Sequence, residues 1–167
     1  MDDVFVEQIV KRKISGVGIL IRIGVTVLAI AACCTIPILG VFGFAITALF
    51  VYLAYLGFVY TSLEYEYSFV NGELTIDKIM GKRRRKHITT YDIKNAEIIA
   101  PMGNEEIRRR FDDLAKLDYS SHFKNEDKEY GMIIEEEGDV GTFLVIIEPD
   151  ERLINAMYHV RPNIVKQ

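Results

Sequence analysis

The sequence predicts an α+β protein in which an N-terminal transmembrane helical hairpin precedes an antiparallel, bent sheet or barrel with a C-terminal helix. Three observations carry this prediction. Residues 23–63 form an apolar run without a charged residue or histidine. Beyond that run, apolar and polar residues alternate as they do in half-buried strands. Near the end of the chain, Pro149 precedes apolar residues at helical spacing.

The apolar run is about two membrane crossings long. A helix needs about 20 apolar residues to cross the hydrocarbon core of a bilayer, and the proline and glycine within residues 35–40 favour a break between two helices. We therefore expect spans at about residues 17–36 and 41–63. No acidic residue lies at mid-membrane depth, so the pattern favours an anchor over a transport site.

Basic residues flank the apolar run on both sides. Lys11, Arg12, Lys13 and Arg22 precede it or lie at its start, a cluster at residues 82–86 follows it, and the connecting loop is uncharged. By the positive-inside rule, this pattern predicts a two-span protein of the cell membrane with both termini in the cytoplasm. Arg22 can extend its guanidinium to the membrane interface; a contact with a lipid phosphate or an intramembrane partner is the alternative.

Residues 1–16 form a juxtamembrane segment before the hairpin. Phe5 and Ile9, with acidic residues nearby, fit a short amphipathic helix. Such a helix would lie along the membrane surface or pack on the domain formed by the rest of the chain.

The alternation after the hairpin predicts an antiparallel meander. Tyr65, Tyr67 and Phe69 share one face of a strand, and the following Asn71-Gly72 is a strong signal for a two-residue hairpin turn. We expect this strand to be followed by strands at residues 73–80, 83–91 and 96–102.

The order YEYSFVNGELTIDKIMGKRRRKHITTYDIKNAEII in this region is similar to the opening of bacterial pleckstrin-homology-like (PH-like) domains. With a two-span hairpin ahead of it, the chain also resembles a family of short bacterial membrane proteins. The resemblance implies a cytoplasmic PH-like domain at residues 64–167 and a terminal helix that closes one end of a bent sheet. PH-like folds often bind lipids or peptides, although a fold alone does not define a function.

The second half of the domain contains an expected helical insertion at about residues 104–117. Asn104 can cap this helix, and Ile107, Phe111, Leu114 and Leu117 give it an apolar stripe. Strands are expected at residues 129–136 and 142–148, the second buried on both faces. The terminal helix starts at Pro149 and turns Leu153, Ile154, Met157 and Tyr158 inward.

Basic side chains near the membrane are the candidate contacts for a lipid or protein partner. Such clusters attract anionic lipid head groups; the alternative for the basic strand is a solvated edge whose charges prevent edge-to-edge pairing. The candidates are Lys11, Arg12, Lys13, Arg22, Lys82, Arg83, Arg84, Arg85 and Lys86.

No residue pattern in the sequence indicates catalysis. His87, His122 and His159 lack metal-ligand spacing, Ser120-Ser121-His122 has no nucleophile elbow, and no cofactor motif is present. Cys33 and Cys34 fit packing residues of a membrane helix, with palmitoylation or a regulatory thiol as the alternative. With 20 Lys+Arg against 24 Asp+Glu, the chain lacks the basic excess of a nucleic-acid-binding protein.

We therefore expect a non-enzymatic integral membrane protein that presents a PH-like interaction module at the inner leaflet. Its partner would be another protein, a second copy of the chain or anionic lipid head groups. The alternative is an accessory or catalytic subunit of a membrane enzyme or transport complex, with a site completed by a partner chain.

Overall fold

A computed structural model describes residues 5–82, 84–123, 128–135 and 141–166. The chain divides into two compact units. The helical unit contains residues 13–63 and 79–85, and the sheet unit contains residues 1–12, 64–78 and 86–167. Each unit is described separately below.

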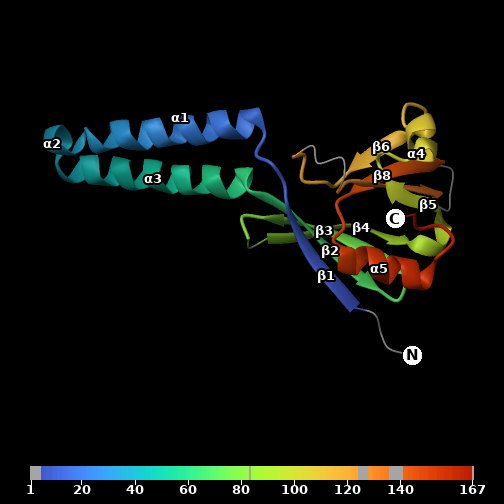
Figure 1. Ribbon diagram of the computed structural model, residues 1–167. Coiled ribbons are helices and arrows are strands. Elements are labelled where there is room, and N and C mark those ends of the chain that lie inside the picture. Colours follow the sequence, from blue (N-terminus) through green and yellow to red (C-terminus); the bar gives the residue numbers. More distant parts are fainter. Residues whose placement is uncertain (1–4, 83, 124–127, 136–140, 167) are drawn as a thin grey trace. The chain divides into compact units, whose positions relative to one another are not determined.

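The helical unit is an antiparallel hairpin of two long helices, α1 (Gly16–Cys33) and α3 (Val41–Thr61), joined through the short helix α2 (Ile36–Leu39) (Figure 1). The side chain of Ser15 caps α1 by accepting from the Gly18 N–H. Gly40 turns the chain between α2 and α3 with a φ of 52°, a conformation that glycine adopts without steric cost. The predicted break between two helices is therefore confirmed.

Apolar side chains of the hairpin remain exposed around both long helices. Leu20 of α1 is 69% exposed, and Val41 and Phe42 of α3 are 83% and 76% exposed. The segments Gly16–Leu39 and Val41–Thr61 have mean hydropathies of 2.4 and 2.0, and both are long and apolar enough to cross a membrane. These bounds agree with the predicted spans to within a few residues.

The first four-stranded sheet has the order β1-β2-β3-β4. Asn71-Gly72 forms the turn between the second and third strands. Both residues have positive φ (52° and 100°), so the predicted hairpin turn is confirmed. The strands are β1 (Phe5–Lys11), β2 (Leu63–Val70), β3 (Glu73–Met80) and β4 (Arg84–Asp92).

The prediction of an amphipathic helix in residues 1–16 was wrong for Phe5–Lys11, which is strand β1. This strand pairs antiparallel with β2 from Phe5↔Val70 to Lys11↔Glu64, and it belongs to the sheet unit. Pairing with β2 gives the backbone N–H and C=O groups of this segment hydrogen-bond partners. A helix of only seven residues would leave many of these groups at its two ends without partners. The sheet unit therefore includes this segment together with residues 64–78 and 86–167 of the predicted domain, and in the sequence the helical hairpin lies between strands β1 and β2.

The second four-stranded sheet has the order β5-β7-β8-β6, and β6 is parallel to β8. The predicted fourth strand of the meander, now β5, thus begins this second sheet instead. The short helix η1 (Ile93–Asn95) lies between the two sheets in sequence. The strands are β5 (Ala96–Pro101), β6 (Ala115–Asp118), β7 (Tyr130–Glu135) and β8 (Thr142–Ile147).

The predicted insertion helix is shorter than expected. Asn104 does cap α4 (Glu105–Arg110), but the helix ends at Arg110 and the chain enters β6 five residues later. Ile107 is fully buried against Ile133 and Leu144. The short helix α4 therefore already buries the first residue of the predicted apolar stripe. Beyond it, pairing of β6 with β8 outweighs the helical periodicity of the sequence.

The terminal helix α5 (Glu151–Val160) follows the predicted pattern with two differences, the first being that it begins at Glu151 and not at the predicted Pro149, because Asp150 is its N-cap. Leu153, Ala156 and Met157 are buried, whereas Tyr158 is 42% exposed. Asp150 is the N-cap residue and accepts from the Leu153 N–H. The helix is also tied to β1, because Gln8 donates to the Glu148 carbonyl and accepts from the Asp150 N–H.

Replacing Asp150 by alanine should lower the free energy of unfolding by about 1 kcal/mol at neutral pH. Burial opposes ionisation of Asp150, but hydrogen bonds from the Leu153 N–H and the Arg152 side chain lower the pKa of its carboxyl below the usual 3.8. Because the folded-state pKa is the lower one, this contribution is complete above about pH 4 and is lost as the pH falls through the folded-state pKa.

Thermal unfolding of the detergent-solubilised chain, followed from about pH 7 to about pH 3, measures this effect. The difference between wild type and Asp150→Ala should shrink at the acid end. Exposed Asp113 is the control, and its replacement by alanine should have little effect at either pH. A difference that grows on acidification would contradict the assignment.

Candidate functional site

The first candidate site is the basic turn between β3 and β4, which belongs to the helical unit. The Gly81 N–H donates to the Ser62 carbonyl at 3.1 Å, and Ser62 is the residue that caps the C-terminal end of α3. Lys82 and Arg84 follow, and both are exposed. The turn is thus attached to the end of an apolar helix.

Gly81 makes this attachment possible. A Cβ at this position would lie 2.3 Å from the Val59 Cγ1, and its φ is +56°. Both the space and the backbone conformation therefore require glycine. The following residue, Lys82, also has a positive φ of 59°, which turns the chain back into β4.

Arg22 of α1 reaches the same end of α3. Its Nε donates to the Thr61 Oγ1 at 2.7 Å and its Nη2 donates to the Ser62 Oγ at 2.8 Å. The guanidinium carbon lies 5.0 Å from the centre of the Phe58 ring, a favourable cation–π distance. Ser62 therefore receives one hydrogen bond from α1 and one from the basic turn.

The other basic candidates are distributed over both units. Lys13 and Arg85 belong to the helical unit, and Lys11 and Lys86 belong to the sheet unit. All four are exposed. Arg83 lies outside the described residues. Among the described basic candidates, Arg22 contacts the end of α3 directly, and Lys82 directly follows Gly81, whose N–H is hydrogen-bonded to Ser62.

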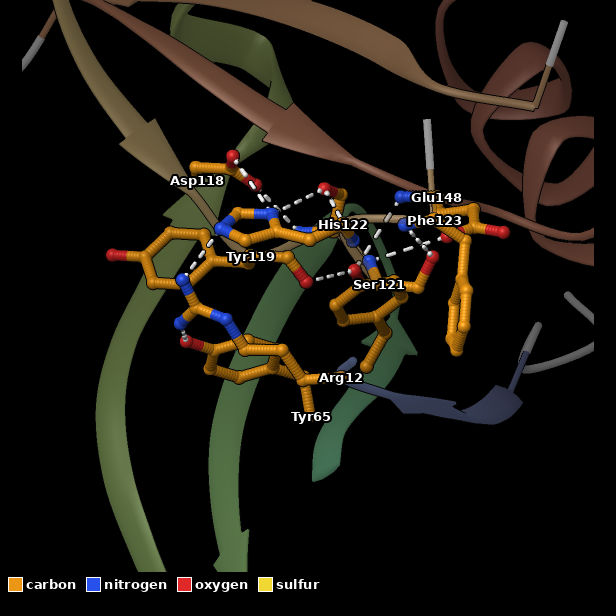
Figure 2. Close-up of polar contacts among 10 residues, drawn as sticks. Arg12, Tyr65, Asp118, Tyr119, Ser121, His122, Phe123 and Glu148 are labelled. Carbon is orange, nitrogen blue, oxygen red and sulfur yellow. Dashed lines mark hydrogen bonds and ion pairs between the residues drawn. The ribbon is translucent and has the colours of Figure 1, made fainter. Parts of the chain in front are cut away.

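Arg12 belongs to a polar network of the sheet unit, which Figure 2 shows. Its Nη1 donates to the Tyr65 hydroxyl, and its Nη2 contacts the His122 Nε2, both at 2.6 Å. The His122 Nδ1 lies 3.2 Å from the Asp118 Oδ2 and 3.3 Å from the Ser120 Oγ. The network connects the end of β1 to the loop after β6.

The network has the residue types of a catalytic triad but a different geometry. A guanidinium only donates hydrogen bonds, so the His122 Nε2 is the acceptor and the proton lies on Nδ1. Ser120 and Asp118 both face that same Nδ1. In a triad, the serine and the acid contact opposite ring nitrogens, so this arrangement orients His122 without activating Ser120.

A buried tyrosine extends the polar contacts to the second sheet. The Tyr67 hydroxyl donates to the Tyr119 carbonyl at 2.7 Å and accepts from the Glu148 N–H at 3.4 Å. Burial raises the pKa of Tyr67. The Tyr65 and Tyr119 rings meet edge to face, with centres 5.5 Å apart. These contacts hold β2 against the ends of β6 and β8.

The sequence did not reveal this network. Asp118 and Ser120 form a recognisable local turn, in which the Ser120 N–H donates to the Asp118 carboxylate. The partner of His122, however, lies 110 residues away in the sequence. No local pattern could therefore have assigned Arg12 to this position.

The sheet unit also contains a groove beside its terminal helix. This groove of about 510 Å³ lies at the start of α5, where Gln8, Tyr130, Glu148, Asp150 and Ile154 line it. The Gln8 amide is already bonded to the Glu148 carbonyl and the Asp150 N–H, and the Asp150 carboxylate already caps α5. Within the described ranges, no group of histidine, cysteine or acidic residues is arranged to hold a metal ion.

The fold and these contacts define an α+β protein in which an apolar helical hairpin is inserted between the first two strands of a PH-like domain. The family model described as "Bacterial PH-like domain (DUF6106)" matches residues 2–167. The chain belongs to this family. No curated protein and no solved structure matches the chain.

Proposed function

We propose that this protein is a two-span integral membrane protein that holds its PH-like domain at the cytoplasmic face of the membrane as a non-enzymatic interaction module. The observation that carries the proposal is the exposure of apolar side chains around α1 and α3. Only 11% and 6% of the residues in their most apolar windows are buried within the protein. Such a surface is unfavourable in water but matches a lipid environment.

The dimensions of the hairpin support a full crossing. At about 1.5 Å per residue, the 21 residues of α3 extend roughly 31 Å, which is close to the thickness of the hydrocarbon core. The two helices pack closely at Gly57, since a Cβ at this position would lie 3.2 Å from a Val25 methyl carbon. Thr47 donates to the Ala32 carbonyl across the pair.

The orientation follows from the charges at the two ends of the hairpin. Lys13, Arg22 and Lys82 belong to the helical unit near its open end, whereas residues 33–41 at the opposite end carry no charge. The positive-inside rule places the open end, and with it both chain termini, in the cytoplasm.

An interaction role fits the polar groups better than a catalytic one. The polar groups of the His122 network form hydrogen bonds and ion pairs with one another. These contacts connect the end of β1, which leads into α1, to the rest of the sheet unit. The domain would then recognise a protein partner, a second copy of the chain or anionic lipids.

Alkaline carbonate extraction of membranes that contain the full chain tests the anchoring. We expect the protein to stay in the membrane pellet, as a control protein with established spans does, while a peripheral control protein is released. Release of the chain with the peripheral control would contradict the proposal.

Chemical crosslinking in intact membranes tests the interaction role. Discrete adducts that persist when the protein is expressed at low level are expected for a specific partner or a second copy. A chain that crosslinks only in proportion to its expression level, and to any abundant membrane protein, would contradict a specific protein partner.

A further inference from the structure

The turn between β3 and β4 is attached to the C-terminal end of α3, which fixes its position along the hairpin. The Gly81 N–H donates to the carbonyl of Ser62, the residue that ends this helix. Gly81 also packs so closely on Val59 that no side chain fits between them. Lys82 lies in this turn and Arg84 is the first residue of β4, so they follow the contact by one and three residues.

Arg22, on helix α1, binds the same C-terminal end of α3. Its guanidinium binds Thr61 and Ser62 and lies over the Phe58 ring. These contacts satisfy it within the hairpin and neutralise part of the partial negative charge at the C-terminal end of α3. Arg22 therefore stabilises the open end of the hairpin, whereas the side chains of Lys82 and Arg84 are exposed.

The level of this turn corresponds to the lipid head groups if α3 crosses the bilayer. The last apolar turn of the helix ends at Thr61, and polar Ser62 follows. A charged side chain close to that point reaches the phosphate region, and long basic side chains gain electrostatic energy there from anionic lipids.

We propose that Lys82 and Arg84, attached to the end of α3 through Gly81, form a contact for the head groups of anionic phospholipids in the adjoining leaflet. The inference rests on the proposed membrane crossing. It assigns the contact to the turn, and it gives Arg22 a role in fastening the hairpin rather than in binding lipid.

Spin-labelled lipids test the contact with the full chain in phosphatidylcholine vesicles. The fraction of motionally restricted label reports the lipid next to the protein, and it is compared for labelled phosphatidylglycerol and labelled phosphatidylcholine. For wild type we expect a preference for phosphatidylglycerol of roughly threefold or more at low salt, decreasing as salt screens the charges.

The charge variant Lys82→Gln/Arg84→Gln should reduce this preference toward about one. The matched control Lys94→Gln/Arg108→Gln removes two exposed charges from the sheet unit and should leave the preference unchanged. The variant Lys82→Arg/Arg84→Lys keeps the charges and should keep the preference, which separates loss of charge from disturbance of the turn.

The outcomes distinguish this inference from the anchoring on which it rests. Equal preference in wild type and the charge variant, or equal loss in the charge variant and its control, would overturn the assignment while restricted lipid still showed a membrane-embedded hairpin. Absence of restricted lipid of either kind would contradict the crossing itself and the inference with it.

Discussion

Replacing Gly43 by valine should destabilise the hairpin strongly, whereas the same replacement at Gly24 should be tolerated. A Cβ at position 43 would lie 2.6 Å from the Ile36 Cα and 2.8 Å from the Thr35 carbonyl oxygen. Because both are backbone atoms in the turn, they cannot move aside as a flexible side chain can. At Gly24 nothing lies within 4 Å. We expect a cost of about 3 kcal/mol or more for Gly43→Val.

The midpoint of thermal unfolding in detergent, followed by circular dichroism, measures the difference between the two variants. Both add the same side chain to an apolar helix, so helix propensity and hydrophobicity are matched. Equal midpoints for Gly43→Val and Gly24→Val would show that the close approach of α2 and α3 does not stabilise the hairpin.

Replacing Tyr67 by alanine should have the largest effect in the sheet unit, about 3–5 kcal/mol in the free energy of unfolding. The ring is fully buried, and its hydroxyl joins Tyr119 and Glu148. The variant Tyr67→Phe keeps the ring and isolates the hydroxyl, whose loss should cost about 1–3 kcal/mol because the Tyr119 carbonyl loses its donor. Tyr158, which is 42% exposed, is the control position.

Alkaline pH gives an independent check on Tyr67. Burial raises the pKa of its hydroxyl, so its contribution is complete below the unfolded-state pKa of about 10 and is lost as the pH rises toward the folded-state value. The difference in unfolding free energy between wild type and Tyr67→Phe should therefore shrink above about pH 10. A constant difference would show that the hydroxyl ionises equally in both states.

Several elements could be predicted because their signals are local. The apolar run defines α1 and α3 by length alone, Asn71-Gly72 specifies a turn that needs two positive φ angles, and alternation identifies β2 and β3. Asn104, the predicted cap of α4, also lies within four residues of the Glu106 N–H that it binds.

Other elements depend on partners far away in the sequence. Phe5–Lys11 is a strand because β2 offers it an edge, although about 50 residues of hairpin lie between them. β6 contains residues that continue a helical stripe, yet its parallel pairing with β8 decides its conformation. In both cases tertiary pairing outweighs a local pattern that is weak over so few residues.

The candidate site was predicted in composition but not in arrangement. The sequence identified the basic residues on both sides of the hairpin, yet it could not separate them by role. Arg12 is held by Tyr65 and His122, Arg22 is held by Thr61 and Ser62, and the turn of Lys82 is attached through Gly81. These differences arise from contacts between residues at least 19 positions apart, which charge patterning does not contain.

The central claim, a hairpin that crosses the membrane with both ends in the cytoplasm, is tested most directly by cysteine accessibility. Cys33 and Cys34 are the two cysteines of the chain, so the background Cys33→Ala/Cys34→Ala allows single probes to be introduced. Ile38→Cys reports the turn between the helices, where Ile38 is 83% exposed, and Lys94→Cys reports the sheet unit. A membrane-impermeant maleimide should label the Ile38 variant in spheroplasts and the Lys94 variant only after permeabilisation. Labelling of the Lys94 variant without permeabilisation would contradict the account.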